Sequence, residues 1–288
     1  MGLKRRIVPV TDMEDERLLK TSLLHEEEQI ERSGSKSPQT SWSDVFNLKH
    51  RPDLNDFISR LIKLYKSILG KVVDYLTARF PQFFPIPALS YVQSQRLNQL
   101  KSEILVPFDY EDLSHVASLR TLWTSAFQDT PCPSGVPVRS PIWKDMGWQG
   151  EDPATDFRGG GVFGLRNLLF LARRRPSLFA ELMGKTRGKR SAWEYPFAVG
   201  GINLTYGLQE MLGLRKNATT DAISRNRAAR HFINLLVKDE SAFDELFCLS
   251  YDLLDRRWIE AGVDYMGFNQ VLKAVVAEVE EALGGLSG

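Results

Sequence analysis

The sequence contains few of the residues on which most catalytic and metal sites depend. It has two cysteines and four histidines, and no histidine lies at metal-ligand spacing with a cysteine or a second histidine. It also lacks the nucleophile motif G-x-S-x-G, the zinc motif H-E-x-x-H and the phosphate-binding loop G-x-x-x-x-G-K-[ST]. We therefore expect no metal, no other cofactor and no nucleotide site that belongs to this chain.

Long apolar runs and an excess of one charge are missing as well. No run approaches the ~20 apolar residues that a membrane span needs, and the start of the chain lacks the apolar core of a signal peptide. The 37 basic residues balance 36 acidic ones, which gives no support for a nucleic-acid partner. Two cysteines are too few for a disulfide framework. These features predict a cytoplasmic protein without a transmembrane segment.

Apolar residues recur with a helical period along most of the chain. After Pro52-Asp53, an i, i+3, i+4, i+7 stripe predicts a buried helix face over 54–76, which the prolines of 80–87 then end. No convincing pair of alternating strands is present. The sequence predicts an all-α fold, an orthogonal bundle of roughly eight to ten helices. Further helices are expected near 88–105, 110–128, 162–175, 177–183, 195–213, 220–237, 241–261 and 268–283.

Three segments depart from this helical pattern. Residues 1–45 are polar and charged, and they predict a mobile N-terminal tail before a helical domain over 46–288. Residues 129–161 are dense in proline, glycine and aspartate, and they predict a long ordered loop of the kind that is often functional. The basic stretch 184–192 has two interpretations, a solvated loop or a patch for an acidic partner or a membrane surface.

The most specific pattern is the stretch 143–168, which reads WKDMGWQGEDPATDFRGGGVFGLRNL. Its glycines satisfy G-x-G-x-x-G, but no strand precedes them, so a dinucleotide-binding fold is rejected. The stretch resembles the signature of the ELMO-domain family, W-x3-G-F-Q-x3-P-x-T-D-F-R-G-x-G-x3-L-x2-L, with Trp148 as the one departure where the family has Phe. A second stretch, YPFAVGGIN at 195–203, is also similar, and the resemblance covers roughly 110–284. The positions that match in the first stretch are Trp143, Gly147, Gln149, Pro153, Thr155, Asp156, Phe157, Arg158, Gly159, Gly161, Leu165 and Leu168.

This resemblance implies a function carried by Arg158. Members that keep the arginine resemble the GTPase-activating proteins for Arf and Arf-like small GTPases, whereas the larger ELMO scaffolds lack it. The resemblance therefore implies that Arg158 is an arginine finger for a partner GTPase, which brings its own Mg²⁺ and GTP. Peripheral contact at an organelle membrane is left open. The alternative is a non-catalytic adaptor that binds a small GTPase or its regulators. In that case Arg158 is structural and ties the loop to the core through Asp152 or Asp156.

The neighbours of Arg158 are expected to support it. Asp156 is placed to pair with Arg158 or to hold its rotamer. For Gln149 we favour a hydrogen bond that braces the loop over a role in orienting the attacking water. Thr155 is expected to cap a turn.

Glycines and aromatic residues complete the expected site. Gly159 and Gly161 remove side-chain bulk beside Arg158, and they allow positive φ and close approach to another protein. Trp143, Trp148 and Phe157 are expected to anchor the loop in the core.

Overall fold

The computed structural model describes residues 88–184, 194–215 and 220–285, together with residues 65, 68, 69, 72, 75, 76 and 79. All of these belong to one unit, Val45–Gly288. The predicted tail, 1–45, lies outside the described residues, as does the basic stretch 184–192 apart from Gly184.

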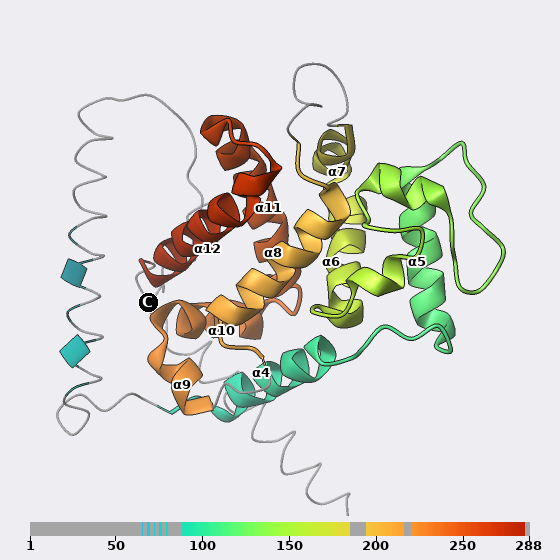
Figure 1. Cartoon of the computed structure of the whole chain (residues 1–288). Coiled ribbons are helices and arrows are strands. Elements are labelled where there is room, and N and C mark those ends of the chain that lie inside the picture. Colours follow the sequence, from blue (N-terminus) through green and yellow to red (C-terminus); the bar gives the residue numbers. More distant parts are fainter. Residues whose placement is uncertain are drawn as a thin grey trace, which may run out of the picture. The chain divides into compact units, whose positions relative to one another are not determined.

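The described residues form helices, turns and loops, with no β-strand among them, which confirms the prediction of an all-α fold (Figure 1). The α-helices are α4 (Tyr91–Ile104), α5 (Leu113–Ala126), α6 (Gly161–Arg174), α7 (Pro176–Met183), α8 (Phe197–Met211), α9 (Thr220–Arg225), α10 (Arg227–Lys238), α11 (Ala242–Ala261) and α12 (Phe268–Gly284). Three short 3-10 helices are η1 (Pro141–Met146), η2 (Pro153–Asp156) and η5 (Tyr265–Gly267).

Local side-chain chemistry sets several helix boundaries. α4 begins with a capping box, in which the Gln93 amide donates to the Ser90 hydroxyl at 3.3 Å and the Ser90 amide donates to Gln93 Oε1 at 2.8 Å. The prediction of a single helix over 220–237 is wrong, because Asn226 separates α9 from α10. Asn226 has an extended backbone, and its side chain accepts a hydrogen bond from the Ala229 amide and starts α10.

Helix α8 lies at the centre of the described helices and packs against α6, α11 and α12 (Figure 1). Close approach requires a glycine here, because a Cβ atom on Gly201 would lie 2.7 Å from Leu168 of α6 and 3.1 Å from the Tyr251 ring of α11. The Tyr251 hydroxyl also donates a hydrogen bond to the Phe197 carbonyl at the start of α8. These contacts fix α8, which carries the second of the two sequence stretches.

The apolar stripe over 54–76 is helical where it is described, but the expected burial is wrong for four of its members. The side chains of Tyr65, Ile68, Leu69 and Val72 are between 47% and 67% exposed. Periodicity shows that a helix has an apolar face, but it does not show what covers that face.

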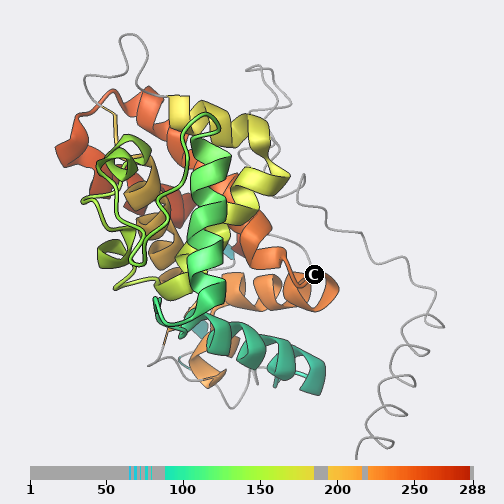
Figure 2. The ribbon, with the colours of Figure 1, turned by 90° about the vertical axis from the view of Figure 1, so that its right-hand side faces the viewer.

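The segment between α5 and α6 is ordered and irregular, as expected, and η1 and η2 interrupt it. Figure 2 shows this segment beside α5. Ser140 and Asp152 cap the two 3-10 helices through their side chains, and a proline follows each cap.

Candidate functional site

Three aromatic side chains fix the 129–161 loop, and all three are buried as predicted. The Trp143 ring meets the Trp123 ring of α5 edge-on, with ring centroids 4.8 Å apart, and its Nε1 donates to the Val138 carbonyl at 2.9 Å. Phe157 stacks on Phe108 at 4.9 Å, and Trp148 meets Phe157 edge-on at 5.2 Å. The loop is therefore held by α5 and by the segment that leads into α5.

Gly147 joins the loop to the start of α8. Its φ is +90°, and a Cβ atom at this position would lie 2.5 Å from the Phe197 nitrogen. The Val199 amide donates to the Gly147 carbonyl at 3.3 Å. The two sequence stretches therefore meet at this point in the fold.

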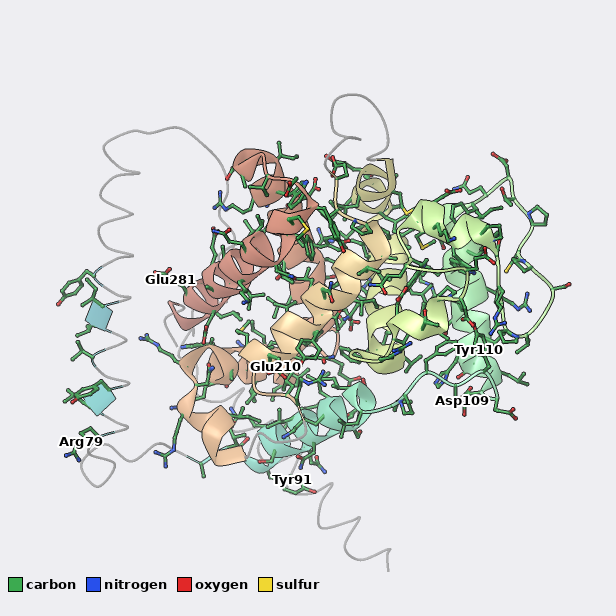
Figure 3. The ribbon with its side chains drawn as sticks, viewed as in Figure 1. Arg79, Tyr91, Asp109, Tyr110, Glu210 and Glu281 are labelled. Atoms are coloured by element: carbon green, nitrogen blue, oxygen red, sulfur yellow. The ribbon has the colours of Figure 1, made fainter. Side chains whose placement is uncertain are left out.

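Asp152 binds several other residues of the loop and its surroundings. Its carboxylate accepts hydrogen bonds from the Tyr110 hydroxyl at 2.6 Å, the Ala154 amide at 3.0 Å and Arg139 Nε at 3.1 Å. The Thr155 hydroxyl donates to the Asp152 carbonyl at 2.9 Å. Burial and the neighbouring carboxylate raise the pKa of Tyr110, which is labelled in Figure 3. The arginine that contacts Asp152, one of the two partners that the structural alternative gave to Arg158, is thus Arg139.

Asp156 fixes the other side of the loop. Its Oδ2 accepts a hydrogen bond from the Gln149 amide at 3.0 Å, so the bracing hydrogen bond favoured for Gln149 comes from its backbone. The Gln149 side chain is exposed. Burial raises the pKa of Asp156, and the Gln149 hydrogen bond and the nearby charge of Arg158 partly oppose this shift.

Residues 157–161, which we call the arginine turn, connect η2 to α6. Gly161 has a φ of +56°, and a Cβ atom on it would lie 2.2 Å from the Val106 carbonyl oxygen. The expected close approach at Gly161 is therefore to a segment of this chain. Gly159 is exposed beside Tyr206, whose ring would lie 3.3 Å from a Cβ atom at Gly159.

Arg158 is exposed at the edge of a hollow of about 940 Å³. Among the residues that the structure describes, its guanidinium has no hydrogen-bond or ion-pair partner. We call this hollow the Arg158 hollow; its lining includes Leu105, Val106, Phe108, Tyr206, Glu210 and Arg215. Leu105, Val106 and Tyr206 are 44%, 38% and 39% exposed, so apolar side chains lie beside polar groups in the lining of the hollow.

The Arg158 hollow contains a second arginine, Arg215, which the sequence analysis did not identify. Arg215 donates to the Gly159 carbonyl at 2.7 Å and forms an ion pair with Glu210 at 2.9 Å. Glu210, labelled in Figure 3, lies near the C-terminal end of α8. No spacing rule links Arg215 to a turn that is distant in the sequence, so no local signal could have identified it.

Two further kinds of feature are absent from the described residues. No group of three or more histidine, cysteine, aspartate or glutamate side chains within them is arranged to hold a metal ion. None of the helices in the same part of the chain has both the length and the apolar character needed to cross a membrane.

Three curated proteins illustrate what the chain resembles. It is 28% identical over 193 residues to ELMO domain-containing protein C of Dictyostelium discoideum, which covers 66% of this chain and 30% of the relative. It is 30% identical over 198 residues to ELMO domain-containing protein A of the same organism, covering 64% and 20%. It is 29% identical over 183 residues to ELMO domain-containing protein 1 of Mus musculus, covering 57% and 52%. The chain thus spans about half or less of the length of these relatives.

No solved structure gives a significant match to the chain. The model of the ELMO/CED-12 family matches residues 98–272, which is more than half of the sequence and contains the arginine turn. This match, together with the motif at 143–168, shows that the chain belongs to the ELMO/CED-12 family.

Proposed function

We propose that this protein is a GTPase-activating protein for a small GTPase of the Arf or Arf-like family, and that Arg158 is its arginine finger. One observation carries the proposal. Arg158 is exposed and has no hydrogen-bond or ion-pair partner among the described residues, although the loop around it is held by buried aromatic rings and hydrogen bonds. The assignment to the Arf class rests on the resemblance of the motif that contains Arg158.

The chemistry of GTP hydrolysis suits a group presented in this way. Negative charge spreads over the transferring phosphoryl group, and an arginine supplied by a second protein accelerates the reaction by ~10³–10⁵. This corresponds to about 4–7 kcal/mol of the activation barrier. The guanidinium stays charged and can contact two oxygens at once. Mg²⁺ and GTP belong to the partner, and this chain supplies the cation.

The surroundings of Arg158 support its presentation to a partner. A group held by a rigid support loses less conformational freedom when it enters a neighbouring active site. Asp152 pairs with Arg139, and among the described residues no hydrogen bond or ion pair joins Arg158 to Asp152 or Asp156, although the charge of Arg158 acts on Asp156. The exposed side chains of Leu105 and Val106 offer the GTPase an apolar contact beside the finger.

A turnover assay tests this proposal. Purified Arf-family GTPases loaded with GTP are mixed with substoichiometric amounts of the protein, and phosphate release is followed. A GTPase-activating protein accelerates hydrolysis of the whole GTPase pool. An adaptor, the alternative function, changes turnover only in proportion to the complex formed. Acceleration that persists in Arg158→Ala would remove Arg158 from the mechanism.

A further inference from the structure

Arg215 contacts the arginine turn from the C-terminal end of α8. Its Nη1 donates to the Gly159 carbonyl at 2.7 Å and lies 3.4 Å from Gln209 Oε1. The guanidinium carbon lies 4.1 Å from the centroid of the Tyr206 ring. A planar cation over an aromatic face with several hydrogen-bond acceptors has little freedom to move. The carbonyl next to Arg158 is therefore fixed by a side chain from another element.

Tyr206 completes this contact. The Gly159 backbone lies against the Tyr206 ring on one side, and the Arg215 guanidinium covers the same ring. On the other side of the turn, the Val162 amide donates to the Val106 carbonyl at 3.1 Å. The chain is thus held at Gly159, the residue that follows Arg158, and again at Val162, directly after the arginine turn.

The ion pair of Arg215 also affects the charge near Arg158. Among the described residues that line the Arg158 hollow, Glu210 is the only carboxylate, and Arg215 Nε contacts its Oε1 at 2.9 Å. An unpaired carboxylate in the hollow would attract the Arg158 guanidinium and draw it away from a partner. Because Glu210 pairs with Arg215, the carboxylate that lines the hollow does not draw Arg158 into it.

We propose that Arg215 is a positioning residue for Arg158: it fixes the Gly159 carbonyl against Tyr206 and neutralises Glu210, so that the Arg158 guanidinium is presented to the partner's phosphates. This inference rests on the proposed function. Arg215 itself is a poor candidate for the finger, since its guanidinium is engaged by Gly159, Gln209, Glu210 and Tyr206.

The first test is independent of any GTPase. Hydrogen exchange of the full chain reports the arginine turn directly, because the Gly160 and Gly161 amides donate to the Phe157 carbonyl and the Val162 amide donates to the Val106 carbonyl. In Arg215→Ala these amides should exchange about tenfold faster. Arg257→Ala is the matched control: Arg257 is 38% exposed against 35% for Arg215, and it pairs with Glu260 and Glu278 away from the hollow. The control should leave exchange in the turn unchanged.

The second test varies the concentration of GTP-loaded GTPase and separates kcat from KM. Arg215→Ala should lower kcat by about tenfold to a hundredfold, because a misplaced catalytic group loses rate, while KM stays within about threefold. Arg215→Lys, which keeps the charge without the planar fork, should fall between Arg215→Ala and the unsubstituted protein. Arg257→Ala should keep both constants.

Three results would overturn the assignment. Unchanged exchange in Arg215→Ala would show that Arg215 does not hold the turn. Faster exchange with an unchanged kcat would show that the position of the turn does not matter for activation. A raised KM with an intact kcat would make Arg215 a docking contact. If the unsubstituted protein accelerates no GTPase, the proposed function fails, and the exchange result alone decides whether Arg215 holds the turn.

Discussion

Gly161 lies so close to Val106 that a Cβ atom on it would be 2.2 Å from the Val106 carbonyl oxygen. The same residue has a φ of +56°, a conformation that costs other residues about 1–2 kcal/mol. Steric conflict and backbone strain therefore coincide at the end of the arginine turn. The motif needs a glycine here for reasons internal to the chain.

Gly161→Ala is predicted to lower the free energy of unfolding by more than about 2 kcal/mol, because the strain and the collision add. Gly262 provides the matched control, with a φ of +59° and no atom within 4 Å of its Cβ position. Gly262→Ala should therefore cost only about 1–2 kcal/mol. Urea denaturation of both variants checks the difference, and equal losses would show that Val106 yields without cost.

Arg158→Ala and Arg158→Lys are predicted to retain the melting temperature of the unsubstituted protein. Replacing an exposed side chain that has no hydrogen bond or ion pair to any described residue changes the free energy of unfolding by no more than about 0.5 kcal/mol. The same two variants should lose most of the acceleration of GTP hydrolysis, Ala by about 10³-fold and Lys by somewhat less. Calorimetry and phosphate release on the same samples check both statements. A collapsed melting temperature would instead support the structural role for Arg158.

Arg166→Leu is predicted to destabilise the fold by about 2–3 kcal/mol near neutral pH. This is less than the ~3–5 kcal/mol lost when one partner of a fully buried ion pair is removed. Arg166 donates to both carboxylate oxygens of Asp244, at 2.9 and 3.2 Å, and also contacts Glu103. The Asp244 side chain is only 4% exposed, so the substitution leaves a buried charge without its main partner.

The pH dependence of this variant gives a second readout. Burial already raises the pKa of Asp244 above its usual 3.8, and Arg166 opposes the shift. Without Arg166 the pKa rises further, so the native state binds a proton before the unfolded state does. Stability of Arg166→Leu should therefore increase as pH falls from neutral through the raised pKa. Adding Asp244→Asn should abolish this increase in denaturation series at pH 7 and pH 5.

His231→Gln is predicted to make the protein less sensitive to mild acid. Burial, together with the charges of Arg227 and Arg230, lowers the pKa of His231 below 6.5 in the folded state. The unfolded state therefore binds the proton first, and stability is lost as pH falls through about 6.5 towards the lower folded pKa. Comparing the unfolding free energy at pH 7.5 and pH 5.5 checks this, and an identical slope in both proteins would contradict it.

Much of the fold was present in local sequence patterns. Seven of the expected helices, near 88–105, 110–128, 162–175, 177–183, 195–213, 241–261 and 268–283, are observed with boundaries that differ by a few residues. Periodicity within one segment is sufficient to specify such elements. The exposure of Tyr65, Ile68, Leu69 and Val72 and the break at Asn226 were not predicted, because burial and helix interruption depend on what the segment meets in the fold.

The sequence by itself determined the helical class, the irregular loop and the motif that contains Arg158, since each of these depends on residues that are close together in the sequence. Only the tertiary structure decided which side chains hold that motif. Asp152 is paired with Arg139 and bonded by Tyr110, and the Gly159 carbonyl is held by Arg215 from the end of α8. These partners are distant in the sequence, and packing of the helices brings them together. The exposure of Arg158 therefore depends on the fold: Arg139 pairs with Asp152, one of the two carboxylates that the sequence alone would have assigned to Arg158, and Arg158 acts on the other, Asp156, through its charge.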